Sequence, residues 1–439
     1  MRVLLVAHQY PPDGLAGVEG YTHSLAGGLA EAGDAVAVVA RRLQPTPFEP
    51  ELRRERTASG VVYRITGGSV SLDDPMLHAH RLERLLTTVL AEHAPDVLQV
   101  NHLVGMPLRL PLIARRLRIP VVLSLLDFYV ACPLEYLRKR SGALCAGPDG
   151  GRECVRTCFA GQPGADRRWP ARNELFRGFL SLADRVLCPS HFVADYFREH
   201  VPKARIDEVP LGVDVPRAVR DAVREQGRRE LQLAYVGAVA PHKGVHIIVE
   251  AAAASGVAAR ITVHGQVYDP AYADALGAAA AGSSTRVDVR GPFRREDLPA
   301  LLSDADAVVL PSQVPEVYPL ALREALALGV PVLAGRLGGL AEAVVEGVNG
   351  ITFEATDPGN LRDVIVRLDG DRGLLERLRR GARATRVPTV AEHVQRLRTL
   401  YAELSAGERA AKPALLERLE RRYDRLTATS VGTGQLSEH

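Results

Sequence analysis

The chain has 439 residues, of which 46% are hydrophobic and 24% are charged, and this is the composition of an ordinary globular protein. The length is sufficient for two domains of roughly 200 residues each. A net charge of +3 is too small to indicate a nucleic-acid-binding protein, and no segment approaches the ~18 uninterrupted apolar residues of a membrane span.

The first part of the chain alternates strand-type and helix-type segments, as in a doubly wound α/β sheet. Strands are predicted at 3–7, 35–40, 97–100, 121–125 and 206–213, and helices at 18–32, 82–93, 106–117 and 191–200. The Pro- and Arg-rich segment 41–60 is predicted to be an exposed excursion. Gly17 precedes the first helix, where the backbone could approach a bound phosphate, although a glycine there also suits a simple tight turn.

Polar residues follow two of these predicted strands. His102 lies just beyond the strand at 97–100, and Asp127 lies just beyond the strand at 121–125. The carboxyl ends of parallel strands are where α/β folds bind ligands. His102 and Asp127 are therefore candidate ligand-binding residues, and the alternative is an ordinary strand-end role.

Four cysteines follow in a loop rich in glycine and arginine. They are Cys132, Cys145, Cys154 and Cys158, separated by twelve, eight and three residues. This spacing is compatible with four thiolates around one tetrahedral zinc ion that staples the loop. None of the gaps has the two-residue spacing of a zinc knuckle, so reduced thiols or two disulfides are alternatives, and we do not expect a metal.

A second α/β unit is predicted after the charged segment 217–230, which we interpret as an interdomain linker. Strands are predicted at 231–236, 261–263 and 287–290, and helices at 245–254 and 298–304. The residues beyond 361 are helical and Arg-rich, with an amphipathic helix at 392–404. The charged tail after Gly407 is expected to form a solvated helix with a disordered end.

The stretch from 306 to 354 has the pattern of a β-α-β unit. Predicted strands at 307–310 and 330–334 flank a helix at 320–328, with Pro319 suited to the first helical position. Glu316 lies in the loop before this helix and Glu324 lies inside it. The free amides of the helix N-terminus could bind an anion between two carboxylates that bind neutral hydroxyl groups, as in a phosphate flanked by sugars.

Several motifs together resemble the family 4 glycosyltransferases. The pair Glu316-x7-Glu324 matches the E-x7-E motif of that family, and GVPVLAGRLGGLAEAVVEGVNG after it looks like the family's donor-domain signature. The segments AYVGAVAPHKGVH, AGVEGYTHSLAGGLAEAGDAV and VPLGVD are also similar to family segments, and DFYVACP with the cysteine loop resembles one subgroup. The resemblance covers about residues 1–405.

The resemblance implies the GT-B fold, an α/β arrangement of two facing Rossmann-like domains with parallel sheets and a deep interdomain cleft. An acceptor-binding domain is expected at 1–214, joined by a helix at about 388–405. A domain that binds the nucleotide-sugar donor is expected at 215–387, and a charged helical or disordered tail at 406–439. The implied activity is retaining transfer of a sugar to a hydroxyl of a glycan, lipid-linked or small-molecule acceptor.

The family's site residues carry over to matching positions of this sequence. Glu324 would hold the ribose hydroxyls, Glu316 the donor sugar, and Lys243 the departing diphosphate, with Glu316 and Lys243 as the catalytic residues. The implied donor-binding set is Gly17, Gly237, Lys243, Phe293, Glu316, Tyr318, Leu320 and Glu324. Because a lysine and backbone amides would stabilise charge on the leaving diphosphate, neither a metal nor a cofactor is expected.

Three positions depart from the family pattern. Ala238 replaces a common arginine, Leu126 replaces a common histidine, and Pro319 replaces a common glycine and offers no amide. These losses leave a second hypothesis, a non-catalytic partner protein that binds sugar nucleotides. We expect a cytoplasmic protein without nucleic-acid partners or a membrane span, and peripheral contact at the inner membrane face is an open alternative.

Overall fold

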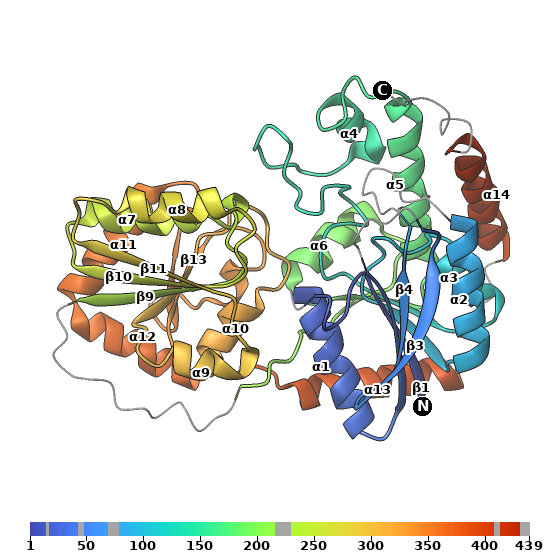
Figure 1. The fold of residues 1–439 in the computed structure, drawn as a ribbon, viewed down its shortest axis with the longest axis horizontal. Helices are drawn as coiled ribbons and strands as arrows, with labels where there is room; N and C mark the ends of the chain where they lie inside the picture. Colours follow the sequence, from blue (N-terminus) through green and yellow to red (C-terminus); the bar gives the residue numbers. More distant parts are fainter. Residues whose placement is uncertain (15–16, 43–47, 69–78, 216–229, 408–412, 431–439) are drawn as a thin grey trace. The chain divides into compact units, whose positions relative to one another are not determined.

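The computed structural model describes two compact units, each built around a parallel β-sheet (Figure 1). Unit 1 comprises residues 1–210 and 390–439, and unit 2 comprises residues 211–389. The described residues are 1–14, 17–42, 48–68, 79–215, 230–407 and 413–430. Most of the interdomain linker predicted at 217–230 lies outside them, because the structure does not describe residues 216–229.

The sheet of unit 1 contains eight strands in the order β3-β4-β2-β1-β5-β6-β7-β8, among the residues described. All neighbouring strands are parallel except the antiparallel pair β3 and β4. Their bounds are β1 Arg2–Ala7, β2 Ala35–Arg41, β3 Glu51–Thr57, β4 Gly60–Thr66, β5 Val97–Val100, β6 Val121–Ser124, β7 Arg185–Cys188 and β8 Ile206–Glu208. The sequences of the central strands are nearly continuous apolar runs, because helices cover both faces of a parallel sheet and bury the side chains on each face.

The helices of unit 1 cover this sheet from both sides. Their bounds are α1 Gly17–Glu31, α2 Ala79–His93, α3 Leu110–Arg116, α4 Arg152–Arg156, α5 Ala165–Leu182, α6 His191–His200, α13 Val390–Ala406 and α14 Pro413–Ser430. Helix α13 packs closely on α1, since a Cβ at Gly28 would lie 2.8 Å from a methyl group of Val394. The Tyr21 hydroxyl also lies 2.9 Å from Nε2 of His393, which joins the two helices by a buried hydrogen bond.

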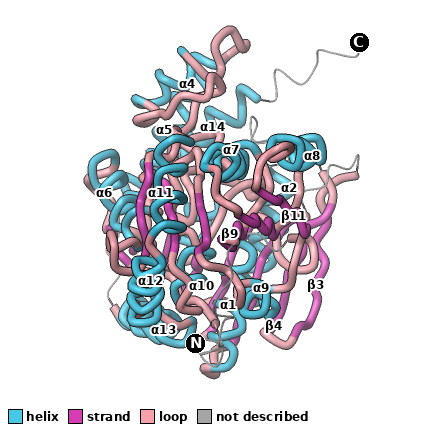
Figure 2. The backbone as a smooth tube through the Cα atoms, turned by 90° about the vertical axis from the view of Figure 1, so that its left-hand side faces the viewer, coloured by secondary structure: helices cyan, strands magenta, loops and turns pink. Residues whose placement is uncertain are grey.

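Helix α14 packs against α5, as Figures 1 and 2 both show. Leu419 fills the space above Gly178, and both Leu419 and Tyr423 are buried. The Tyr423 hydroxyl donates to the Glu83 carboxylate at 2.5 Å. The expectation of a fully solvated helix in the tail was therefore wrong for α14, because one apolar face of an otherwise charged helix is buried. Residues 431–439, where a disordered end was expected, lie outside the described residues.

The sheet of unit 2 has the order β11-β10-β9-β12-β13-β14, and its strand pairs are parallel. The strands are β9 Leu231–Val236, β10 Ala259–His264, β11 Thr285–Gly291, β12 Ala307–Leu310, β13 Val332–Gly335 and β14 Gly350–Phe353. The helices are α7 Val245–Ser255, α8 Pro270–Ala279, α9 Leu298–Leu301, α10 Leu320–Ala327, α11 Pro358–Gly370 and α12 Arg372–Ala384. Figure 1 shows α7, α8 and α11 on one face of this sheet and α9, α10 and α12 on the other.

Several elements differ from the sequence prediction. The predicted excursion at 41–60 contains strand β3, whose charged side chains are mostly exposed, so no apolar alternation marked it. Residues 43–47 of that excursion lie outside the described residues. The strand predicted at 206–213 ends at Glu208. Helices α5 and α8 and strands β4 and β14 were not predicted, and in α5 the reason is a high density of charged residues around its buried face.

Candidate active site

Lys243 and Glu316 form an ion pair in unit 2. Lys243 ends the short 3-10 helix Pro241–Lys243 after β9, and Glu316 lies in the loop between β12 and α10. The Lys243 Nζ atom is 2.7 Å from Glu316 Oε1, which also accepts a hydrogen bond of 2.8 Å from the Ser312 hydroxyl. Burial alone would raise the pKa of Glu316, but Lys243 and Ser312 outweigh it and hold the pKa below its ordinary value. The Glu316 carboxylate is therefore ionised at neutral pH.

Glycines allow the backbone to hold this pair in place. A Cβ on Gly244 would lie 2.2 Å from the Pro311 carbonyl oxygen, and φ of Gly244 is 75°, a left-handed conformation. Gly338 has a φ of 62°, and its Cβ would lie 2.6 Å from the Glu316 carbonyl oxygen. The amide of Gly339 donates to that same oxygen at 2.6 Å. The Gly338-Gly339 pair thus fixes the backbone that presents the Glu316 carboxylate.

Glu324 is buried on α10 and is paired with a residue that the sequence analysis missed. Its Oε1 atom is 2.5 Å from Nε of Arg295, and its side chain is 5% exposed while that of Arg295 is 42% exposed. Arg295 begins the 3-10 helix Arg295–Asp297 in the loop after β11. The only sequence feature that could have indicated Arg295 as a partner of Glu324 was the charged run RRED in this loop. The predicted ribose-binding carboxylate therefore has a solvent-facing counter-ion.

The start of α10 carries the other predicted donor-binding groups. Leu320 is the first helical residue, and Pro319 is the N-cap with extended backbone, so the prediction of Pro319 at the first helical position was wrong by one residue. Pro319 makes no side-chain cap, which leaves the first amides of α10 without a capping side chain. The Tyr318 hydroxyl donates to the Leu211 carbonyl at 3.0 Å, and the buried Arg323 guanidinium lies 3.8 Å from the Tyr318 ring centroid.

Gly237 and Phe293 lie beyond the carboxyl ends of β9 and β11. Gly237 has a φ of 151°, and its carbonyl oxygen would lie 1.7 Å from a Cβ placed on Gly265, so the backbones after β9 and β10 touch. Phe293 is half-buried and meets the ring of His264 edge-on at 6.3 Å. Ala238, where the family commonly has arginine, accepts a hydrogen bond of 2.8 Å from the Tyr235 hydroxyl through its carbonyl.

In unit 1 the structure brings His102 and Asp127 into direct contact. Asp127 Oδ2 pairs with Nε2 of His102, and Asp127 Oδ1 accepts a hydrogen bond of 2.8 Å from the Tyr129 amide. The Val104 amide donates to Nδ1 of His102 at 3.1 Å, which fixes the orientation of the imidazole. Burial alone would raise the pKa of Asp127, but the ion pair with His102 and the hydrogen bond from the Tyr129 amide together lower it below its ordinary value. The His102 side chain is 4% exposed and that of Asp127 is 24% exposed.

A second histidine–carboxylate pair, which the sequence analysis missed, lies beside the first. His8 follows β1 and Glu19 lies in the first turn of α1, and His8 Nε2 is 3.0 Å from Glu19 Oε1. The rings of His8 and His102 are 4.3 Å apart between centroids. The strand order β1-β5-β6 explains this cluster, because it places the carboxyl ends that carry His8, His102 and Asp127 next to one another. The only sequence signal for His8 was its position after the first strand.

Gly17 is the first residue of α1 and is exposed, and a Cβ added there would meet no atom within 4 Å. Packing within unit 1 therefore does not require a glycine at this position. Residues 15 and 16, which precede it, lie outside the described residues.

The four loop cysteines surround one small pocket. Cys132, Cys145, Cys154 and Cys158 all line it, and all are free thiols. The Cys145 thiol donates to the Gly147 carbonyl at 3.3 Å. In the described part of the chain, no three histidine, cysteine, aspartate or glutamate side chains are arranged to hold a metal ion.

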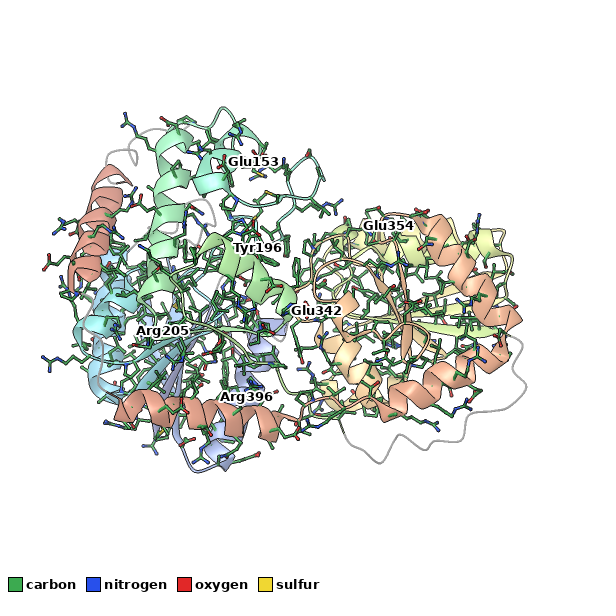
Figure 3. All side chains as sticks on the ribbon, turned by 180° about the vertical axis from the view of Figure 1, so that it is seen from behind. Glu153, Tyr196, Arg205, Glu342, Glu354 and Arg396 are labelled. Atoms are coloured by element: carbon green, nitrogen blue, oxygen red, sulfur yellow. The ribbon has the colours of Figure 1, made fainter. Side chains whose placement is uncertain are left out.

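Two residues labelled in Figure 3 make contacts with this loop. Glu153 on α4 pairs with Lys139, and the hydroxyl of Tyr196 on α6 would lie 3.2 Å from a Cβ on Gly147.

Comparisons with known proteins fit this geometry. A family model described as Glycosyltransferase Family 4 matches residues 15–217, and one described as Glycosyl transferases group 1 matches residues 220–385. The chain is 36% identical over 203 residues to the D-inositol 3-phosphate glycosyltransferase of Salinispora arenicola, over 41% of this chain and 45% of that protein. The chain therefore spans less than half the length of this curated relative.

Solved structures resemble nearly the whole chain. Sucrose-phosphate synthase from Thermosynechococcus elongatus matches with a TM-score of 0.62 and 18% identity, over 97% of this chain and 99% of that one. HepE from Anabaena, in complex with UDP and glucose, matches with a TM-score of 0.63 and 17% identity, over 92% and 99%. Among the described residues, no helix has the length and apolar content to cross a membrane. The chain belongs to the family 4 glycosyltransferases and has the GT-B fold of two Rossmann-like domains.

Proposed function

We propose that this protein transfers a sugar from a nucleotide-sugar donor to an acceptor hydroxyl, with retention of configuration at the anomeric carbon. The observation that carries the proposal is the Lys243–Glu316 ion pair, which lies in the loops beside the start of α10. Both side chains are about one-fifth exposed, so a ligand can reach them. Retention is the chemistry of the family that the sequence resembles.

The diphosphate of the donor would bind where positive charge and free amides are available. Breaking the bond between the sugar and the diphosphate places negative charge on the departing phosphate. Lys243 and the uncapped amides at the start of α10 would stabilise that charge in the transition state. Because Lys243 supplies a fixed cation, the proposal needs neither a resident metal nor a cofactor. Pro319 has no backbone N–H, so the phosphate would have to bind to neighbouring amides.

The sugar and the ribose of the donor would bind to the two carboxylates. Glu316 is ionised and can accept hydrogen bonds from the hydroxyls of the donor sugar. Glu324 can accept hydrogen bonds from the ribose hydroxyls through Oε2, while its Oε1 atom pairs with Arg295. Gly237 and Phe293 would meet the nucleotide by backbone and ring contacts, and Gly17 of unit 1 would approach the donor phosphate. HepE was solved with UDP, so a uridine nucleotide is the first donor to test.

The acceptor would bind in unit 1, where His102 and Asp127 form a polar site at the ends of parallel strands. A glycan, a lipid-linked sugar or a small molecule can each supply the required hydroxyl. We place the reaction in the cytoplasm because the cysteines of this chain are free thiols, the form kept by reducing compartments.

A donor screen tests the proposal. The purified protein is incubated with UDP-, GDP- and ADP-sugars and a mixture of hydroxyl acceptors, and released nucleoside diphosphate and glycosylated product are measured by mass spectrometry. We expect one donor class to be consumed, and proton NMR of the product to show the anomeric configuration of the donor. An inverted product would contradict retention.

The alternative function is binding of sugar nucleotides without catalysis, and the replacements at Ala238 and Leu126 favour it. The same screen separates the two, because a binding protein would bind a nucleotide sugar tightly by calorimetry and release no nucleoside diphosphate with any acceptor. The intact Lys243–Glu316 pair supports catalysis over this alternative.

A further inference from the structure

Arg64 is a buried residue of strand β4 that binds the loop segment 9–14, which follows β1. Arg64 is 4% exposed. In the parallel register of unit 1, Arg64 lies level with Ala40 of β2, and Ala40 lies level with Ala7, the last residue of β1. Arg64 is therefore at the carboxyl edge of the sheet, where the chain leaves β1 and where ligands bind in α/β folds.

The Arg64 guanidinium has an acceptor for each of its five N–H donors. Nη1 donates to the Tyr10 carbonyl at 3.2 Å and to Oδ2 of Asp13 at 2.5 Å, and Nη2 donates to the Pro11 carbonyl at 3.0 Å. The other two donors, on Nε and Nη2, bond to the two carboxylate oxygens of Glu55, each at 3.2 Å. A planar guanidinium with every donor satisfied is held in one orientation, so it fixes the backbone that it binds.

The antiparallel strand β3 supplies the carboxylate that orients this guanidinium. Arg53 lies opposite Arg64, and Glu55, two residues further along β3, therefore occupies a diagonal position on the same face. The Glu55 side chain is 45% exposed, whereas that of Arg64 is 5% exposed. The charged strand that the sequence did not predict thus supports a buried arginine, which in turn binds the loop segment 9–14.

This loop segment borders the polar cluster of unit 1. A Cβ on Gly14 would lie 3.0 Å from Oε1 of Glu19, so the loop backbone packs against that side chain. Glu19 pairs with His8, whose ring is 4.3 Å from the ring of His102. His102 in turn pairs with Asp127, which is 24% exposed. A chain of direct contacts therefore joins the loop to the residues proposed to bind the acceptor.

The loop segment also has a surface that a ligand can reach. Four of its six residues are half-buried, and Pro12 is exposed. An exposed loop loses conformational entropy when a ligand orders it, and this loss reduces the affinity for the ligand. A loop that is already held in its binding conformation avoids most of that loss.

We propose that Arg64 is a positioning residue for the acceptor: it holds the loop segment 9–14 in the conformation that binds the acceptor beside His102 and Asp127. This inference rests on the proposed glycosyl transfer. Arg64 is buried and acts through the loop, without touching the acceptor itself. Loss of its bonds to the loop should raise KM for the acceptor. The affinity for the nucleotide should not change, because the residues proposed to hold the nucleotide lie in unit 2.

The kinetic test weakens these bonds from both sides. Asp13→Asn removes the carboxylate of the loop with little change of shape, and Arg64→Lys keeps the charge but cannot bond to both carbonyls and both carboxylates at once. We expect each variant to raise KM for the acceptor by about 10- to 100-fold, with kcat within about threefold of wild type. Arg64→Met should raise KM further, so lysine gives partial rescue. A merely structural role would instead lower kcat, through fewer folded molecules, and leave KM unchanged.

Two further variants test whether the effect passes through this contact. The double variant Asp13→Asn/Arg64→Lys should raise KM by less than the product of the single effects, because both changes remove the same interaction. The control is Arg54→Met on β3, which removes an ion pair of 3.0 Å with Glu92 of α2 and is 48% exposed. Its KM for the acceptor should stay within about twofold of wild type.

Two measurements without turnover accompany the kinetics. The Asp13 amide donates to the Tyr10 carbonyl at 3.1 Å, so hydrogen exchange of the segment 9–14 reports on the order of the loop. Exchange there should be faster in Arg64→Lys and Asp13→Asn than in wild type, with wild-type exchange retained at 211–389. Calorimetry with UDP, GDP and ADP should give the same nucleotide affinity for both variants and wild type.

The kinetics use the donor and acceptor that the donor screen identifies, with octyl β-D-glucoside and myo-inositol included in the acceptor mixture. An acceptor KM within about twofold of wild type in both Asp13→Asn and Arg64→Lys would overturn the inference, as would unchanged exchange of the segment 9–14. Such results with an active wild type would leave the proposed function intact. If wild type consumes no donor, the proposed function fails and this role fails with it, while the exchange measurement still shows whether Arg64 holds the loop.

Discussion

The ammonium group of Lys243 lies 2.7 Å from the carboxylate of Glu316, so the two proposed catalytic side chains are each other's counter-ions. The two residues are 73 positions apart in the sequence, and the parallel pairing of β9 with β12 brings their loops together. A ligand that bears both phosphate and hydroxyl groups can engage the two halves of this pair at once. This relationship makes Lys243 the first position to test.

Replacing Lys243 with methionine removes the cation while it keeps the aliphatic stem. We expect a loss of about 2–4 kcal/mol of transition-state stabilisation, seen as a fall of about 30- to 1000-fold in kcat/KM for the donor. The pKa of Glu316 should rise above its ordinary value, because burial then acts without Lys243. Lys203→Met, at an exposed position of unit 1, is the control. Full activity in Lys243→Met would remove Lys243 from the site.

Glu324 and Arg295 should differ in their effect on nucleotide binding. Glu324→Ala removes the proposed ribose acceptor, and a lost charged hydrogen bond of about 1.5–3 kcal/mol weakens binding by about 10- to 150-fold. Arg295→Gln removes a counter-ion that is 42% exposed, so solvent limits its cost to about 1 kcal/mol or less. Calorimetry with the bound nucleoside diphosphate measures both, with Glu250→Ala on the exposed face of α7 as control. Equal effects at both positions would contradict direct ribose binding by Glu324.

The contact between α5 and α14 should contribute to the stability of unit 1. A Cβ on Gly178 would lie 2.1 Å from a methyl group of Leu419, so Gly178→Val forces α14 away from α5. Overpacking of this kind typically costs about 1–3 kcal/mol in the free energy of unfolding. Gly277→Val on α8 is the control, because it makes the same substitution in a helix at a position where a Cβ meets no atom within 4 Å. If urea denaturation shows the same cost for both variants, α14 does not dock as described.

His393 should make the protein less stable in mild acid. Burial lowers the pKa of His393 to about 4 from an ordinary value of 6.5, and its ring bonds to Tyr21 and the Pro210 carbonyl. The unfolded chain therefore binds a proton at higher pH than the folded chain. The stability from a neutral His393 is complete above pH 6.5 and is lost as the pH falls toward 4, and the loss amounts to about 3 kcal/mol.

The His393→Gln variant tests this expectation. Urea denaturation between pH 7.5 and 4.5 should show a smaller decline in the free energy of unfolding for His393→Gln than for wild type. The exposed His23→Gln variant should follow wild type. Parallel pH dependence in His393→Gln and wild type would show that other groups control the acid response.

The cysteine loop is predicted to hold thiols rather than a metal. Burial, followed by the effect of neighbouring cysteines, raises the pKa of Cys154 to about 12, so a metal ion would have to displace the proton of a buried thiol to bind there. We expect elemental analysis of protein purified without chelator to find no stoichiometric metal, and a thiol reagent to count five thiols after unfolding. One zinc per chain, with four thiols protected until a chelator is added, would reverse this prediction.

Much of the fold could be predicted because the pattern of each segment depends on local burial. Continuous apolar runs such as those at β1 and β2 occur where helices cover both faces of a sheet, and they were visible in the sequence. Strand β3 was not visible, since its charged residues gain their conformation by pairing with β4 rather than by burial. Helix α14 was predicted as a helix, but its buried face could not be assigned without its partner α5.

The sequence by itself determined the α/β class, the family and the candidate donor residues, because strand–loop–helix periodicity and the Glu316-x7-Glu324 spacing are local in the chain. Only the tertiary structure decided the partners of those residues. Arg295 beside Glu324, His8 beside Glu19 and His102 beside Asp127 depend on which strand ends lie next to each other. Strand order is set by long-range packing of the sheets, and no local pattern of residues records it.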